Sequence, residues 1–140
     1  MSYWSKVEPY WDDVSIYDGE ELFLDQFSRL PKVSQTLFAA HWLQSEVGNG
    51  GFFQFFQNDT GVLAPEALSA FKELGMPKCA DIVARAMEPY GHPYPRGAKA
   101  REESPDKCWD WEFLDRLSGE FHACIKVENG GFEAAAISMR

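Results

Sequence analysis

The chain is poor in cysteine and has no long apolar run. Its three cysteines, Cys79, Cys108 and Cys124, are odd in number and widely spaced, which indicates reduced thiols rather than a disulfide framework. No apolar run reaches the roughly 18 residues that a membrane-spanning helix needs. Residues 1–20 lack the basic and apolar segments of a secretory signal. These absences predict a soluble, cytoplasmic protein.

Basic side chains are scarce as well. The chain has 13 lysines and arginines against 22 acidic residues, and its formal net charge is −9. Residues 1–31 carry seven acidic and two basic side chains, residues 102–140 carry nine and four, and residues 32–101 are nearly neutral. This balance disfavours direct binding to nucleic acid, because phosphates would be repelled, and it favours a basic partner. The simpler alternative is that the charge only keeps the protein soluble.

The alternation of apolar and polar residues that is typical of a strand is also absent. Apolar residues recur instead at spacings of three and four, as in amphipathic helices. A length of 140 residues suits one domain, and an aromatic content of 15% favours a packed core. We therefore expect a single all-α domain over residues 1–140, with about seven or eight helices packed around residues 33–56 and no sheet.

Local signals place the individual helices. Residues 18–30 open with Asp18 as the expected N-cap and Glu21 three residues later, a capping-box pattern. Residues 2–14 are expected to be helical with an interruption at Pro9. The segment 91–107 has three prolines and two glycines and is expected to be a long connecting loop. Further helices are expected at residues 31–48, 51–57, 64–75, 77–90 and 108–127.

The most unusual stretch is E-V-G-N-G-G-F-F-Q-F-F-Q-N-D, residues 46–59. A β-hairpin would need a strand on each side, and a phosphate-binding loop would need a preceding strand and a following basic or hydroxyl residue. A corner between two helices fits, with Gly48, Asn49 and Gly50 ending the first helix and Gly51 allowing close backbone approach. The structural residues of this motif are expected to be Asn49, Gly50, Gly51, Phe52, Gln54, Phe55, Phe56 and Asn58.

A shorter version of the motif recurs eighty residues later. V-G-N-G-G-F at residues 47–52 matches V-E-N-G-G-F at residues 127–132, and Leu37 aligns with Leu117 at the same offset. Each copy follows a long predicted helix. The match indicates either an old duplication or the same corner chemistry used twice.

The central part of the chain resembles a known family. The stretch 46–58, Gly61, the helix E-A-L-S-A-F-K-E-L-G at 66–75 and the helix A-D-I-V-A-R-A-M at 80–87 resemble the DMP-type family of small acidic helical bacterial proteins. Gly48 stands where the family signature has Asn. The family includes a DNA mimic that occupies the DNA-binding face of a helix-turn-helix repressor. The resemblance therefore implies an all-α fold and, as an expectation, a DNA-mimic interaction with a transcription regulator.

Catalytic and metal-binding patterns are weak in this chain. No nucleophile–base arrangement lies on a strand–turn–helix frame. Cys108, His122 and Cys124 could supply zinc ligands, but residues two apart on a helix point about 200° apart, so no metal or cofactor is expected. The protein is accordingly expected not to be an enzyme. The alternative is an enzyme or small-ligand binder with a polar pocket near His41, Gln54 and Asn58.

The remaining candidates are acidic residues near the two ends of the chain. If these ends pack together, their carboxylates could form one negative face that attracts a basic protein partner by charge complementarity. A helix-turn-helix regulator is the expected partner, a regulatory or immunity-type partner that does not bind DNA is the alternative, and a homodimer stays open. The expected partner-binding residues are Asp12, Asp13, Glu20, Glu21, Asp25, Glu102, Glu103, Asp106, Asp110, Glu112 and Asp115.

Overall fold

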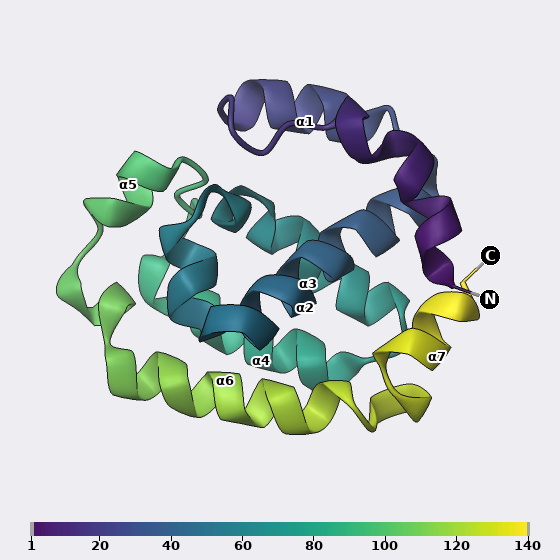
Figure 1. Cartoon of the computed structure of the whole chain (residues 1–140). Coiled ribbons are helices and arrows are strands. Elements are labelled where there is room, and N and C mark those ends of the chain that lie inside the picture. The colour runs from purple at the N-terminus through teal and green to yellow at the C-terminus, as the bar shows by residue number, and fades with distance from the viewer. Residues whose placement is uncertain (1, 140) are drawn as a thin grey trace.

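The computed structural model describes residues 2–139, and within that range it contains helices and no strand (Figure 1). It confirms the expected all-α fold and single compact domain. The α-helices are α1 (Glu20–Ser28), α2 (Lys32–Gln57), α3 (Ala64–Glu73), α4 (Pro77–Met87), α5 (Ala98–Glu102), α6 (Trp111–Ile125) and α7 (Phe132–Ile137).

Short 3-10 helices connect these elements and form the N-terminal segment. The segment expected to be helical, 2–14, contains two 3-10 helices, Tyr3–Lys6 and Glu8–Asp13, which are separated by Val7, and Pro9 lies in the first turn of the second. Proline suits that position because the first turn leaves its backbone nitrogen without a partner in any case. The six 3-10 helices are η1 (Tyr3–Lys6), η2 (Glu8–Asp13), η3 (Asp59–Leu63), η4 (Glu88–Tyr90), η5 (Asp106–Trp109) and η6 (Glu128–Gly130).

Helix α2 is the centre of the fold. It packs against α3 and α6, and α4 packs against both of these, while α1 and α6 lie on opposite sides of this group (Figure 1). The apolar stripe predicted on α2 is confirmed, since Leu37, Ala40, Leu43 and Val47 are completely buried. Burial of each large apolar side chain contributes about 1.5–3 kcal/mol, so this one helix supplies a substantial part of the core.

The two ends of the chain meet on one side of the molecule. The N and C labels lie next to each other beside α7 in Figure 1. The ring of Tyr3 packs edge-to-face on Phe132, with centroids 5.3 Å apart, and Lys6 Nζ donates a hydrogen bond to the backbone carbonyl of Met139. Helix α7 thus closes the fold against η1.

The start of α1 differs from the prediction. Asp18 does not cap this helix, which begins after Gly19 with no side-chain cap. Gly19 has a φ of 98°, and the Asp18 carboxylate instead accepts a hydrogen bond of 2.6 Å from the Ser15 hydroxyl. The glycine conformation delays the helix by one residue and leaves the aspartate in the preceding turn.

The predicted loop 91–107 is partly helical, so that prediction was wrong in part. It contains α5 and η5, and it is fastened to the rest of the fold by the side chains of Tyr94, Arg96 and Arg101. The following helix, α6, begins at Trp111 because the carboxylate of Asp110 accepts a hydrogen bond of 3.2 Å from the backbone N–H of Phe113.

A corner, an acidic edge and the family of the chain

The corner inside α2 forms at one glycine. Residues 48–50 keep helical backbone angles, and the break comes at Gly51, with φ 77° and ψ −179°. The expectation that Gly48, Asn49 and Gly50 end the helix is therefore corrected. The expectation of close approach at Gly51 is confirmed, because an added Cβ would lie 2.9 Å from Ser118 Oγ on α6. That hydroxyl accepts a hydrogen bond of 2.9 Å from the Phe52 N–H.

Beyond the break, the aromatic residues anchor the second part of α2. Phe52, Phe55 and Phe56 are completely buried, as expected from their spacing. Phe52 meets Phe121 of α6 edge-to-face at 5.8 Å, and Phe56 lies 5.0 Å from the ring of Tyr90. Such pairs contribute about 0.5–1.5 kcal/mol beyond area burial, so the corner is held by packing on two neighbouring elements.

The polar residues of the motif bind Glu46, one carboxylate that the sequence analysis did not single out. Gln54 Nε2 donates to Glu46 Oε2, and Thr60 Oγ1 donates to Glu46 Oε1 at 3.1 Å. Asn58 Nδ2 lies 3.3 and 3.4 Å from the two carboxylate oxygens. The Glu46 carboxylate therefore joins the helix before the break to the turn after it.

Arg101 on α5 is the second residue that the sequence analysis missed. Its side chain is completely buried, and its Nε and Nη2 donate to the carbonyls of Phe56 and Asn58 at 2.8 and 2.7 Å. Gly61 makes room for it, since a Cβ there would lie 2.6 Å from the guanidinium carbon. A cation suits this place because the last carbonyls of a helix lack partners and carry partial negative charge.

The structure does not bring His41 into a pocket with Gln54 and Asn58. His41 and Gln54 are 13 residues apart on α2, about 20 Å along a helix. His41 Nδ1 lies 2.7 Å from the Tyr3 hydroxyl, and its ring is 4.8 Å from Trp4. Burial lowers the pKa of His41, which favours the neutral imidazole. His41 thus contacts the N-terminal segment, whereas Gln54 and Asn58 bind the carboxylate of Glu46.

All eleven acidic residues predicted to bind a partner are exposed. Asp25 pairs with Arg29 at 2.8 Å, and Asp110 caps α6. Among residues 2–139, the other nine have neither an ion pair nor a side-chain hydrogen bond, although the molecule does pair acids elsewhere, as in Arg96–Glu66 at 2.8 Å. The nine are Asp12, Asp13, Glu20, Glu21, Glu102, Glu103, Asp106, Glu112 and Asp115.

Five of these nine acids belong to the start of α1 or to the segment of α5 and η5. The first turn of α1, which holds Glu20 and Glu21, lies toward the same side of Figure 1 as α5, with η5 and the start of α6 below it. We call the residues Glu20, Glu21, Glu102, Glu103 and Asp106 the acidic edge.

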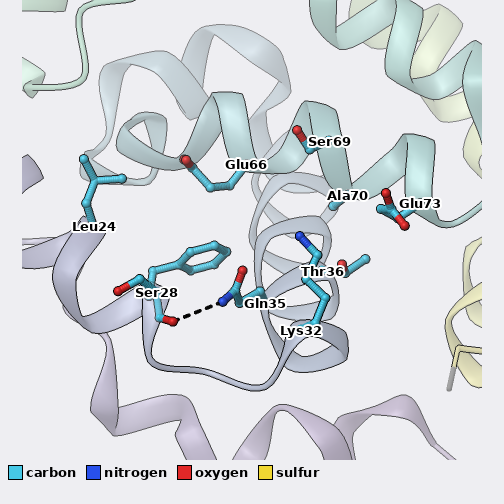
Figure 2. A pocket seen from close by; sticks show the side chains of 10 residues that line it. Leu24, Ser28, Lys32, Gln35, Thr36, Glu66, Ser69, Ala70 and Glu73 are labelled. Carbon is cyan, nitrogen blue, oxygen red and sulfur yellow. Dashed lines mark hydrogen bonds between the residues drawn. The ribbon is translucent and has the colours of Figure 1, made fainter.

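A separate groove lies beneath α1. It has a volume of about 460 Å³ and runs between α1, the start of α2 and α3 (Figure 2). Its lining mixes polar groups such as Lys32, Glu66 and Ser69 with the apolar Leu24, and Gln35 donates to the Ser28 carbonyl across it at 3.4 Å. The carboxylate of Glu66 is already engaged in a salt bridge with Arg96. This indicates that the groove is a gap in the packing rather than an assembled catalytic site.

The cysteine and histidine set weighed for zinc does not converge. Cys108 is buried, His122 Nε2 lies 3.0 Å from the carbonyl of Val47, and Cys124 faces Glu128. The divergence agrees with the helical geometry that argued against this set. None of the described helices is both long and apolar enough to cross a membrane.

The sequence model of the DMP19-like protein family matches residues 28–137. This match covers most of the chain, and the protein therefore belongs to the DMP19-like family. The matched part includes the corner, α5 and α6, whereas Asp12, Asp13, Glu20, Glu21 and Asp25 precede it. No curated protein sequence and no solved structure matches this chain.

Proposed function

We propose that this protein is a non-enzymatic interaction protein whose acidic edge binds the basic DNA-binding surface of a transcription regulator, in the manner of a DNA mimic. The observation that carries the proposal is the state of the carboxylates. Nine of the eleven predicted acids are exposed and unpaired within residues 2–139, whereas Asp81, Glu120 and Glu66 pair with arginines of the same chain. Unpaired carboxylates keep their charge available for a partner.

Membership of the DMP19-like family supports the same function, because the resemblance implies DNA mimicry. The corner holds part of this surface in a fixed position. Arg101 holds α5 against the end of α2, Trp109 Nε1 donates to the Arg101 carbonyl, and the next two residues after Arg101 are the exposed Glu102 and Glu103. Duplex DNA carries one charge about every 1.7 Å of its axis, so a mimic needs its carboxylates held at fixed positions.

The binding surface is tested by capture followed by competition. The purified chain is immobilised, a DNA-binding protein is captured from the source cells, and the chain is then titrated into the complex of that protein with its DNA. We expect the wild type to displace DNA, and the displacement to weaken with salt, because exposed charges are screened.

The matched variants are E102Q/E103Q on the acidic edge and E73Q/E133Q away from it, which remove the same charge. We expect E102Q/E103Q to need at least about tenfold more protein for half-displacement, as for loss of about 1.4 kcal/mol, and E73Q/E133Q to behave like wild type. An equal loss of DNA displacement in both variants would show that displacement depends on net charge and not on the acidic edge. Capture of a partner that binds no DNA would instead support the regulatory or immunity-type alternative.

A further inference from the structure

Two cysteines and a glutamate from three elements meet at the second copy of the corner motif. Cys79 comes from the first turn of α4, Cys124 from the last turn of α6 and Glu128 from η6. Their sulfur and oxygen atoms all lie within 4.8 Å of one another. Cys79 and Cys124 are 45 residues apart, so no sequence spacing indicates that they meet.

Glu128 is held in place by the backbone of α4. Its Oε2 accepts a hydrogen bond of 2.7 Å from the N–H of Lys78, and its Oε1 accepts one of 2.9 Å from the N–H of Cys79. The thiol of Cys124 also points at Oε1, at 3.5 Å. A carboxylate has two oxygens with about four acceptor positions, so these bonds leave lone pairs free on the side of the sulfurs.

This combination of donors is one that zinc prefers. Zinc binds thiolates at about 2.3 Å and carboxylate oxygens at about 2.0–2.2 Å in a tetrahedron, which places neighbouring donor atoms about 3.5–3.8 Å apart. A group whose donors already lie within 4.8 Å needs only side-chain adjustments of about 1 Å to reach that spacing. The rigid carboxylate, fixed by two backbone donors, resembles the supported ligands of metal sites.

The cluster is closed on one side and open on the other. Cys79 is completely buried, whereas Cys124 lines a groove of about 670 Å³ between α4 and α6, together with Pro77 and Val127. Val127 is 71% exposed at the rim of this groove. A fourth ligand, water or a donor from another molecule, can therefore approach from the groove.

We propose that Cys79, Cys124 and Glu128 form a zinc site with three protein ligands and a fourth position that opens into the groove between α4 and α6. Binding replaces the two S–H bonds with two zinc–sulfur bonds and releases two protons, while the carboxylate binds through an oxygen without loss of a proton. The bound ion links α4, α6 and η6. This inference is independent of the acidic edge, which lies on other elements.

The test uses the full chain, reduced and stripped of metal with a chelator. Zinc is titrated against a chromophoric competitor, and cobalt(II) is used as a spectroscopic substitute for zinc. We expect one equivalent of zinc to bind, a thiolate-to-cobalt charge-transfer band to appear in the near ultraviolet, and the Tm to rise, because a ligand that binds only the folded state stabilises it.

Three variants separate the cluster from other cysteine chemistry. C124S keeps the half-exposed position polar and should lose the charge-transfer intensity of one thiolate, with zinc affinity lowered at least 10-fold. E128Q should weaken zinc binding while both thiolate contributions to the cobalt spectrum remain. C108S is the matched control, since its buried thiol lies outside the cluster, and it should bind zinc like wild type.

Each contrary result overturns the proposal. Zinc binding that C124S leaves unchanged would place the ion elsewhere, and cobalt binding without a charge-transfer band would show oxygen-only coordination by surface acids. A variant of the completely buried Cys79 is not needed, because C124S and E128Q change less buried ligands and decide the question. A mass loss of two hydrogens in the native chain, blocked by prior thiol alkylation, would show a disulfide in place of a metal site.

Discussion

The two copies of the N-G-G-F motif share four residues and the conformation of their second glycine but use different partners. Gly51 has φ 77° and ψ −179°, Gly131 has φ 95° and ψ 161°, and each is followed by a buried phenylalanine. In the first copy the helix continues through Asn49 and Gly50, whereas in the second α6 ends at Ile125 and Asn129 takes a φ of 51°. The common element is therefore the glycine before the phenylalanine.

The tertiary partners account for the difference. Val47 is completely buried, so the first copy stays helical against the core, while the equivalent Val127 is 71% exposed and leaves the second copy free to turn. Asn129 Nδ2 then donates to the carbonyl of Leu74 at 2.7 Å, and Glu128 caps α4. The first corner fastens the segment that bears part of the acidic edge, and the second closes the fold beside the two chain ends.

The largest effect is expected at the first corner from Arg101→Met. At least two buried carbonyls would lose a charged donor, at about 1–3 kcal/mol each, so we expect the free energy of unfolding to fall by about 3–5 kcal/mol. Urea denaturation measures it. Asn129→Ala is the comparison in the second corner, and the loss of its single bond to Leu74 O together with alanine at a φ of 51° should cost about 1–2 kcal/mol. Equal losses would contradict the distinction between the corners.

The two glycines with matching conformations should differ in tolerance to alanine. Both substitutions place a side chain at positive φ, at about 1–3 kcal/mol. The added Cβ at Gly131 would meet the backbone oxygen of Lys126 at 2.8 Å, whereas at Gly51 it would meet the rotatable Ser118 hydroxyl at 2.9 Å. Thermal unfolding should therefore show the larger loss for Gly131→Ala.

Gly48→Ala is the matched control for this pair. Its backbone is helical, and an added Cβ has no neighbour within 4 Å, so alanine should stabilise the protein by about 0.5–1 kcal/mol. A clear loss at Gly48 would show that residues 48–50 need glycine flexibility, as the sequence alone suggested.

A smaller effect is expected from Glu46→Gln. The amide keeps the shape of the side chain but offers one acceptor oxygen where Gln54, Asn58 and Thr60 now donate to a carboxylate. We expect a loss of about 1–2 kcal/mol in the free energy of unfolding. Glu46→Asp, which retains the charge but shortens the side chain, tests whether position or charge matters. No loss in either variant would remove this carboxylate from the account of the corner.

The smallest effect is expected from Glu128→Gln, and it depends on pH. Burial alone would raise the pKa of Glu128, but hydrogen bonds from the backbone of Cys79 and Lys78 outweigh it and lower the pKa below the ordinary value of 4.5. The folded state thus binds the proton less readily than the unfolded state. The stabilisation from Glu128 is complete above that ordinary value and is lost as the pH falls through the lowered pKa.

In metal-free buffer at neutral pH, Glu128→Gln should cost about 0.5–1 kcal/mol, as for a weakened helix N-terminal cap. The difference between wild type and variant should shrink as the pH falls below 4.5. A difference that stays constant to the lowest pH at which the protein folds would show that the charge of Glu128 does not contribute.

The comparison also shows what sequence patterns can predict. The spacing of apolar residues predicted α2 and its buried stripe. The spacing of the phenylalanines correctly predicted which rings anchor the corner. Both predictions depend only on local periodicity. The position of the break was wrong, since three successive residues permit positive φ and only packing against Ser118 selects Gly51.

The hydrogen bonds from Arg101 to the end of α2 could not be predicted either, because they too depend on tertiary packing. A charged residue in a segment rich in proline and glycine is normally exposed, and its burial here depends on unpaired carbonyls of Phe56 and Asn58 more than forty residues away. Glu46 was overlooked because its partners follow the corner. The exposed acids were identifiable by charge alone, but which of their segments share one side of the molecule required the fold.

The most direct test of the central claim is the salt dependence of binding to the captured regulator. If the acidic edge replaces DNA phosphates, the logarithm of the binding constant for the regulator should fall steeply and linearly with the logarithm of the salt concentration. Protein–DNA binding shows the same dependence. We predict this slope for wild type and E73Q/E133Q and a clearly shallower slope with weaker binding for E20Q/E21Q/E102Q/E103Q. An unchanged slope and affinity in the fourfold variant would contradict an acidic edge as the binding surface.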